Sequence, residues 1–162
     1  MVKTAIDYSH SNIEPKYVFA LVSTADSMIP KLSNMLINQL SIKHWAKLRK
    51  IEKSHYADKF LRKWDDIKEI LYRVDIKFYF DDIIKQNKDI INNSTEIIID
   101  DTIFSKYLRK YEGKGKLILE KDAQGFRKAF IDLADNICNI VRWLWNKKDN
   151  YKKQIILEKF IK

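Results

Sequence analysis

The sequence predicts a single α/β domain in which a mixed β-sheet is flanked by helices. The chain has 162 residues, a length that suits one domain, and 46% of them are hydrophobic, which is enough for one buried core. Segments with strand-like and helix-like patterns alternate along the chain, as they do in α/β proteins. Only 3 Gly and 2 Pro are present, so we expect long elements joined by few tight turns.

A β-hairpin is predicted at the start of the chain. Residues 3–9 and 16–24 are rich in β-branched and aromatic side chains, which favour strands. The turn-like residues 10–15 separate them and end in Pro15. Asp7 therefore lies near the end of the first strand.

Two helices are predicted after the hairpin. From Ala25 to about Lys50, apolar residues recur three or four positions apart, with Pro30 in the first turns. A second stripe of apolar residues, with lysines opposite, predicts another helix from about Tyr56 to Arg73.

The second half of the chain returns to strands and then ends in helices. The strand 96–99 is expected to be buried on both faces because it is continuously apolar. In chain order the pattern predicts a strand at 75–80, a short helix within 81–94, a strand at 96–99, a helix at 102–111, a strand at 116–120 and a long helix at 124–147. Residues 1–145 form the predicted domain, and 146–162 form a basic tail, apolar enough to dock as a helix.

Composition excludes several classes of protein. With Cys138 as the only cysteine, neither an intramolecular disulfide nor a Cys-rich zinc site can form, and no Gly-rich loop is present to hold a nucleotide phosphate. Apolar runs are far shorter than the roughly 20 residues that span a bilayer. Because the start also lacks the apolar run of a signal peptide, we expect a cytoplasmic protein that does not cross a membrane.

The charge balance favours a polyanionic partner. There are 31 Lys plus Arg against 22 Asp plus Glu, a net charge of +9. Such a surplus favours nucleic acid ahead of an anionic membrane surface.

Acidic residues recur where predicted strands end. Asp7 lies near the end of the first strand, Asp100 and Asp101 follow 96–99, and Asp132 and Asp135 lie in the long C-terminal helix. Carboxylates at the carboxyl ends of neighbouring strands converge on one crevice. A cluster of this kind needs a compensating cation, and Mg²⁺ or Mn²⁺ prefers oxygen ligands. Two such ions can clamp the attacking and leaving oxygens in phosphoryl transfer.

Four segments, in order, resemble domain-of-unknown-function family 3800. Proteins of that family start with an Asp-Glu-Ser-Gly strand and end in a helix reading roughly Gln-Leu-Ala-Asp-Leu. The resemblance extends to about Arg142 and includes, more loosely, a Lys/His motif at 53–57. The segments are Ile6-Asp7-Tyr8-Ser9, Ile97-Ile98-Ile99-Asp100-Asp101, Leu117-Ile118-Leu119-Glu120-Lys121-Asp122 and Ile131-Asp132-Leu133-Ala134-Asp135-Asn136-Ile137.

The resemblance implies an RNase H-like fold and a metal-dependent nuclease. Carried over position by position, it nominates Asp7, Asp100 and Asp135 as catalytic metal ligands, with Asp122 as a fourth ligand. The sequence departs from the family pattern in three places. Tyr8 replaces the Glu of the first motif, His10 replaces its Gly, and Asp132 stands where Gln is usual.

Four further residues are candidate accessories to this site. Each acid could instead have a structural role, as a cap or in an ion pair. Asp7 also suits a turn cap, and Asp100 or Asp101 suits the N-cap of the following helix. Asp135 also suits an exposed polar face paired with Lys128 or Arg142, and Asp81 with Asp82 is a rival pair after 75–80. The accessories are Asp101, Asp132, His10 and His55. The histidines, His44 among them, show no metal-ligand spacing and are typical of surface positions.

Basic residues crowd the two middle helices. They are candidate phosphate contacts, although a solvated lysine face explains the same pattern. The candidates are Lys43, Lys47, Arg49, Lys50, Lys53, Lys59, Arg62 and Lys63.

Two functions remain open at this point. The first is a Mg²⁺- or Mn²⁺-dependent nuclease that cuts DNA or RNA with one or two metal ions. The second is a noncatalytic module that binds nucleic acid or protein and keeps the fold. In either case the tail from Asn146 offers a surface for a second subunit of a homo-oligomer.

Overall fold

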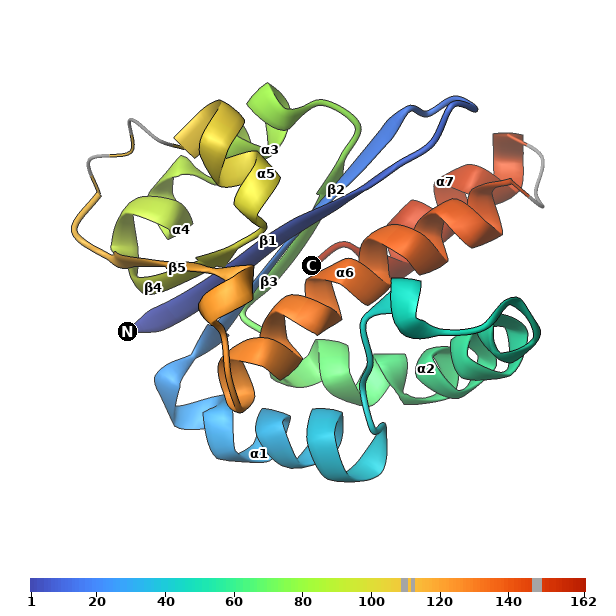
Figure 1. The fold of residues 1–162 in the computed structure, drawn as a ribbon, viewed down its shortest axis with the longest axis horizontal. Helices are drawn as coiled ribbons and strands as arrows, with labels where there is room; N and C mark the ends of the chain where they lie inside the picture. The colour runs from blue at the N-terminus through green and yellow to red at the C-terminus, as the bar shows by residue number, and fades with distance from the viewer. Residues whose placement is uncertain (109–110, 112, 147–149) are drawn as a thin grey trace.

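A five-stranded mixed sheet forms the centre of the computed structural model (Figure 1). The structure describes residues 1–108, 111, 113–146 and 150–162. The strand order is β3-β2-β1-β4-β5, in which β2 is antiparallel to β1 and β3, and β4 and β5 run parallel to β1. The strands are β1 (Val2–His10), β2 (Tyr17–Ala25), β3 (Arg73–Lys77), β4 (Ser94–Ile99) and β5 (Lys116–Leu119).

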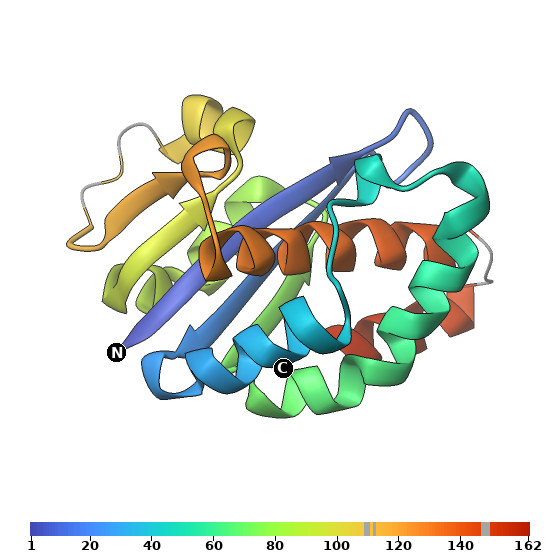
Figure 2. The same ribbon diagram turned by 60° about the horizontal axis from the view of Figure 1, so that its bottom comes forward.

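Helices cover both faces of this sheet (Figures 1 and 2). The long helix α6 crosses one face over β1 and β2, with α1, α2 and α7 around it, while α3, α4 and α5 cover the other face. The helices are α1 (Ile29–Ser33), α2 (Lys50–Ile70), α3 (Phe80–Gln86), α4 (Lys88–Asn93), α5 (Asp101–Ile103), α6 (Phe126–Trp145) and α7 (Asn150–Phe160). Shorter helical segments are η1 (Asp26–Met28), η2 (Asn34–Gln39), η3 (Trp45–Lys47), η4 (Phe104–Leu108) and η5 (Glu120–Asp122).

The central strands are apolar because both of their faces are buried. Along β2, Ala20 and Val22 pack under α6, whereas Phe19 and Leu21 pack under α3. This double burial explains the continuous apolar runs, which a sheet open on one side does not need. The predicted α/β class, with a mixed sheet flanked by helices, is confirmed.

The hairpin and the long C-terminal helix form close to their predicted bounds, whereas the first helical region differs. Instead of one helix from Ala25 to Lys50, the helical turns end at Gln39. Ser41 then takes a positive φ of 51°, which turns the chain out of the helix. The residues 40–48 form a linker that crosses α6, and Trp45 lies at the start of the short turn η3.

The next helix and strand both lie nearer the N-terminus than predicted. α2 begins at Lys50, six residues before Tyr56, because Glu52 accepts a hydrogen bond from the backbone N–H of Arg49 and caps the helix. β3 ends at Lys77, so Asp81 and Asp82 do not end a strand. They lie in the first turn of α3, where negative charge is favourable.

Residues 80–93 form two helices instead of one. The break falls at Asn87, whose buried side chain donates hydrogen bonds to Asp75 Oδ2 (2.7 Å) and to the carbonyl of Ile83. The predicted helix 102–111 corresponds to α5 and η4, and residues 109 and 110 lie outside the described part. The tail contains α7, and its residues 147–149 also lie outside it. Within the described residues, no helix combines the length and apolar character needed to cross a bilayer.

Candidate metal centre

Three carboxylates lie at the same level of the sheet, Asp7 within β1 and the other two directly after β4 and β5. Ile6 of β1 pairs with Ile99 of β4, and Ile99 pairs with Leu119 of β5. The next residue on each strand is an acid, namely Asp7, Asp100 and Glu120. Because these strands are parallel, their carboxyl ends share one edge, and the three side chains gather there.

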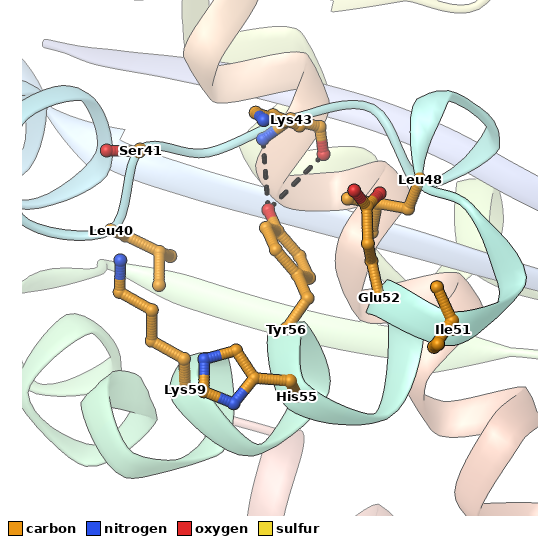
Figure 3. Close-up of a pocket in the computed structure, with 9 residues that line it drawn as sticks. All are labelled: Leu40, Ser41, Lys43, Leu48, Ile51, Glu52, His55, Tyr56 and Lys59. Atoms are coloured by element: carbon orange, nitrogen blue, oxygen red, sulfur yellow. Dashed lines mark hydrogen bonds between the residues drawn. The ribbon is translucent and has the colours of Figure 1, made fainter.

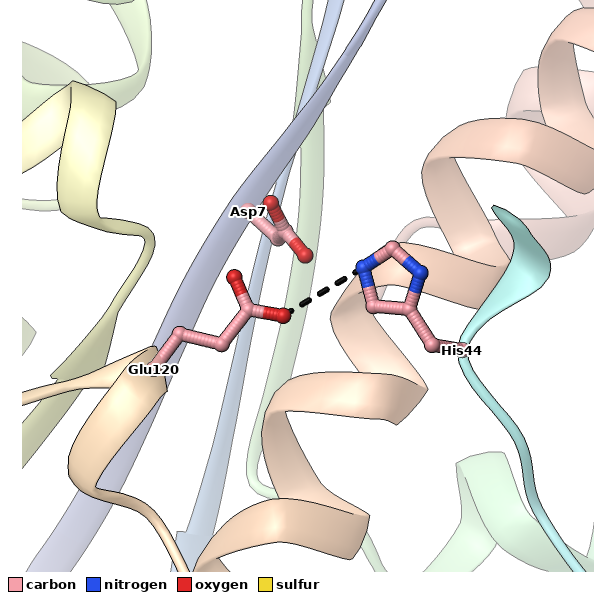
Figure 4. A group of neighbouring side chains, drawn as sticks. All are labelled: Asp7, His44 and Glu120. Carbon is pink, nitrogen blue, oxygen red and sulfur yellow. Dashed lines mark ion pairs between the residues drawn. The ribbon is translucent and has the colours of Figure 1, made fainter. Parts of the chain in front are cut away.

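Two further side chains reach this edge from outside the sheet. Asp135 comes from α6, which packs across β1, and is 3% exposed. His44 comes from the linker 40–48, and its Nε2 lies 3.3 Å from Glu120 Oε1 and 3.3 Å from Asp135 Oδ1. Figure 4 shows the side chains of Asp7, His44 and Glu120 pointing toward one another.

Hydrogen bonds fix the orientation of most of these carboxylates. Asp135 Oδ2 accepts from the backbone N–H of Trp45 (2.7 Å), and its Oδ1 accepts from Asn139 Nδ2 (3.1 Å). Asp100 Oδ1 accepts from the backbone N–H groups of Thr102 (2.8 Å) and Ile103 (3.1 Å), so Asp100 is the N-cap of α5. Asp100 therefore caps α5 and also lies close to the other acids.

Asp7 is the exception, because one of its oxygens is left without a partner. Its Oδ1 accepts from the backbone N–H of Tyr8 (2.7 Å). Its Oδ2 is buried and has no hydrogen-bond partner among the residues that the structure describes, and the whole residue is only 3% exposed. A buried carboxylate oxygen of this kind is unfavourable unless a cation or donor meets it.

The electrostatics of the site disfavour negative charge on the two most buried acids. Burial, reinforced by Asp135 and Glu120, raises the pKa of Asp7 well above its ordinary value. Burial also raises the pKa of Asp135 to about 6, although His44 and the N–H of Trp45 oppose the shift. Burial likewise raises the pKa of Asp100.

His44 compensates charge at both Glu120 and Asp135, and Lys128 Nζ lies 4.0 Å from Glu120 Oε1. The hydrogen bond between His44 and Glu120 raises the pKa of His44 and lowers the pKa of Glu120. One imidazolium balances at most one of the four carboxylates, so the cluster retains negative charge. That excess favours a bound cation.

The donor set fits a divalent cation. Ligand atoms of Asp7, His44 and Glu120 all lie within 4.8 Å of one another, and the unpartnered Oδ2 belongs to Asp7. Carboxylate oxygens suit Mg²⁺ and Mn²⁺, and a single imidazole is compatible with Mn²⁺. Asp7, Glu120 and His44 are therefore the residues that would hold such an ion, with Asp135 and Asp100 beside them.

The remaining predicted acids lie around this group and not in it. Asp122 is exposed at the end of η5, and Glu120, two residues earlier, reaches the cluster instead. Asp101 is half-buried next to Asp100, and within the described part of the chain its Oδ1 has no hydrogen-bond partner. Asp132 is buried on α6 and paired with Lys128 Nζ at 2.5 Å, one turn from Asp135.

The two accessory histidines do not reach the carboxylates. His10 is exposed at the end of β1, with its ring 4.9 Å from that of Tyr17. His55 is exposed on α2, where it lines a hollow with Lys43 and Lys59 (Figure 3).

Sequence reasoning missed Glu120 and His44. Glu120 satisfies the same rule that selected Asp7 and Asp100, since it is the first acid after a strand, but the family pattern drew attention to Asp122. His44 carries no such signal. The prediction of a surface histidine is wrong because the linker folds back over α6 and half-buries the side chain.

The predicted basic residues separate into two groups. Lys47 borders a hollow of about 480 Å³ beside Glu120 and His44, and Lys43 and Lys59 border the hollow of Figure 3. The others do not border these two hollows. Arg49 is paired with Glu52, Lys53 Nζ lies 5.5 Å from the centroid of the Trp45 ring, and Lys50, Arg62 and Lys63 lie elsewhere on α2.

No family model and no curated protein matches this chain. Among solved structures, the chain is similar to the crystal structure of the ribonuclease H2 from Pyrococcus horikoshii OT3. The two sequences are 12% identical, the alignment covers 93% of this chain and 77% of that chain, and the TM-score is 0.49.

Proposed function

We propose that this protein is a divalent-metal-dependent nuclease that hydrolyses phosphodiester bonds in DNA or RNA. The observation that carries the proposal is the gathering of Asp7, Asp100, Glu120 and Asp135 at one sheet edge around the unpartnered Oδ2 of Asp7. The proposal includes membership of domain-of-unknown-function family 3800, on the resemblance of the four sequence segments.

The residues of the site have three roles, namely metal binding, positioning of His44 and contact with phosphate groups. Asp7, Glu120 and His44 would hold Mg²⁺ or Mn²⁺, and such ions stabilise the charge that develops when a phosphodiester is attacked. Asp135 holds the linker through the N–H of Trp45 and keeps His44 facing the carboxylates. Lys47 and Lys121, both exposed beside Glu120, supply positive charge for the phosphate groups.

Calorimetric titration with Mn²⁺ and Mg²⁺ tests the site directly. We expect binding by the wild type, and its loss in Asp7→Asn and in Glu120→Gln. Asp122→Asn is the matched control, because Asp122 is an exposed acid two residues from Glu120 and should bind metal like the wild type. Metal binding that survives Asp7→Asn and Glu120→Gln would sink the proposed site.

Cleavage assays on single-stranded and double-stranded DNA and RNA then test the reaction. Activity should require Mg²⁺ or Mn²⁺, disappear with EDTA and be absent from Asp7→Asn. Metal binding without cleavage of any of these substrates would contradict the nuclease assignment while leaving the metal site in place.

A noncatalytic binding module is the second candidate, and one contact favours it. His44 already lies within ion-pair distance of both Glu120 and Asp135, so an imidazolium is available as a partial substitute for a metal ion. The signature of this function is salt-sensitive binding of nucleic acid that EDTA leaves unchanged. Absence of metal binding in the wild type, together with that signature, would favour it over the nuclease.

A further inference from the structure

We propose that a strand of nucleic acid runs from the metal centre along three neighbouring hollows, past η5 and the linker 40–48 to α2, and is held there by lysines through its phosphates. The proposal rests on the proposed function, because it identifies the substrate path of the same site.

The first hollow adjoins the carboxylates. It has a volume of about 480 Å³ and is bordered by Glu120 and His44 of the metal centre. Lys47, Lys121 and Lys128 border the same hollow, together with Asp101, so three cations lie around the position of a phosphate next to Glu120.

Neighbouring hollows share bordering lysines. Lys128 also borders the second hollow, of about 460 Å³, which lies between the linker and the start of α6. Lys43 borders both that hollow and the third, of about 430 Å³, where Lys59 and His55 of α2 complete the lining (Figure 3). Each hollow thus shares a bordering lysine with the next one, and basic side chains recur from Glu120 to α2.

A hydrogen-bonded clamp fixes the linker at the junction of the second and third hollows. The backbone N–H of Lys43 donates to Tyr56 Oη (3.0 Å), and the carbonyl of Lys43 accepts from Asn136 Nδ2 (2.7 Å). Tyr56 Oη in turn donates to Asn136 Oδ1 (2.6 Å). The backbone of Lys43 is therefore held between α2 and α6, while its side chain is exposed.

The charge balance along this path selects a polyanion. Among the described residues, the side chains of Lys43, Lys47, Lys59 and Lys121 have no ion-pair partner. Asp101, which borders the first hollow, also has no ion-pair partner among these residues, but the two acids that border the second and third hollows are engaged. Glu52 is paired with Arg49, and Asp132 is paired with Lys128.

Apolar side chains line the third hollow beside its lysines. Leu40, Leu48 and Ile51 line it together with the ring of Tyr56, and Ile51 is 83% exposed. Such an apolar lining suits the sugar or base of a nucleotide whose phosphate lies between Lys43 and Lys59. Lysine ammonium groups act as point charges on phosphates, so the path should hold strands with little regard to base sequence.

Oligonucleotide binding in EDTA, where cleavage is off, tests the path with single strands of about 8 and about 16 nucleotides. Lys121→Ala, beside the metal centre, should weaken binding of both lengths severalfold. Lys59→Ala, at the far hollow, should weaken only the longer strand. For each lost contact, the slope of log K against log salt should fall by about 0.7. Lys88→Ala, an exposed lysine of α4 on the other face of the sheet, should bind both strands like the wild type.

Four outcomes would overturn the path. They are equal weakening of both lengths by Lys59→Ala, no weakening by it, an effect of Lys88→Ala as large as that of Lys59→Ala, and binding of neither strand by the wild type. The proposed function is judged separately by metal binding and cleavage, so retained metal-dependent cleavage alongside any of these outcomes would reject the path alone.

Discussion

The Asp7 carboxylate is held in an environment that is unfavourable for its own charge. It is 3% exposed, its Oδ2 has no partner, and Asp135 and Glu120 add negative charge nearby. A site that binds a cation needs such a preorganised carboxylate, and without the cation the folded state is less stable. The charge of Asp7 therefore favours metal binding but lowers the stability of the metal-free protein.

Asp7→Asn should stabilise the metal-free protein while abolishing metal binding. An amide is neutral at every relevant pH and can donate from the position of the unpartnered oxygen, so the free energy of unfolding should rise by about 1–3 kcal/mol. Urea unfolding in EDTA near neutral pH measures the change. Asp122→Asn, at an exposed position, should leave it unaltered, and a destabilised Asp7→Asn would show that Asp7 is a structural residue.

The pH dependence of the metal-free protein should follow the same groups. A group whose pKa is raised on folding contributes stability at low pH, which is lost as the pH rises through its folded-state pKa. This holds for Asp135, with a pKa of about 6 against an ordinary 3.8, and for Asp7 and His44, whose pKa values are also raised. The free energy of unfolding should therefore fall from about pH 5 through about pH 6, where Asp135 loses its proton, and should fall further at higher pH as Asp7 and His44 lose theirs.

Thermal unfolding in EDTA across that range provides the measurement. The pKa of Glu120 is lowered, so its contribution to stability is lost as the pH falls. That loss occurs below its ordinary pKa of 4.5, which is more acidic than this range. Mn²⁺ should raise the unfolding temperature most at the alkaline end, because its ligands must be deprotonated. A flat profile in EDTA would contradict the raised pKa values.

At the scale of elements, the linker 40–48 completes the site. It supplies His44 and the N–H of Trp45 to the carboxylate cluster, and it is tied to α2 and α6 through Tyr56 and Asn136. The phenol of Tyr56 is buried, and this burial raises its pKa to about 12, so it remains a neutral hydroxyl that can donate and accept.

Tyr56→Phe should loosen this linker without changing any carboxylate. The change leaves Asn136 Oδ1 and the N–H of Lys43 without their partner, so the free energy of unfolding should fall by about 1–3 kcal/mol. Metal affinity should fall about 10-fold or more, as it does when outer groups that orient ligands are removed. Urea unfolding and metal calorimetry measure the two effects. Wild-type metal affinity in Tyr56→Phe would mean that the linker is held without this clamp.

At the scale of the whole molecule, the C-terminal tail is part of the main core. Phe160 of α7 is fully buried against Trp64 of α2, with their ring centroids 5.0 Å apart. Lys162 exchanges backbone hydrogen bonds with Val74 of β3 and so extends the sheet edge. The tail therefore closes the face of the sheet that carries α2 and α6.

Phe160→Ala should destabilise the protein by about 3–5 kcal/mol, because a large side chain leaves a cavity in the main core. Ile161→Ala, at a residue that is 37% exposed, is the control and should change stability far less. Urea unfolding followed by tryptophan fluorescence detects both. A small loss in Phe160→Ala would show that the tail is a separable appendage.

Much of the fold was predictable because it depends on local pattern. Alternating and continuous apolar runs located the five strands, and the apolar stripe of 124–147 located α6. Errors arose where local pattern competes with distant contacts. The stripe after Gln39 looked helical, but the positive φ of Ser41 and the hydrogen bond from Trp45 to Asp135 direct the chain across α6 instead.

The sequence by itself determined that acids follow apolar strands, since Asp7, Asp100 and Glu120 each come after a run of β-formers. Only the tertiary structure decided which acids meet. The register Ile6–Ile99–Leu119 brings Glu120 and not Asp122 to the level of Asp7, and the folded linker delivers His44. The physical reason is that side-chain type is a property of one residue, whereas proximity depends on strand register and helix packing set by the whole core.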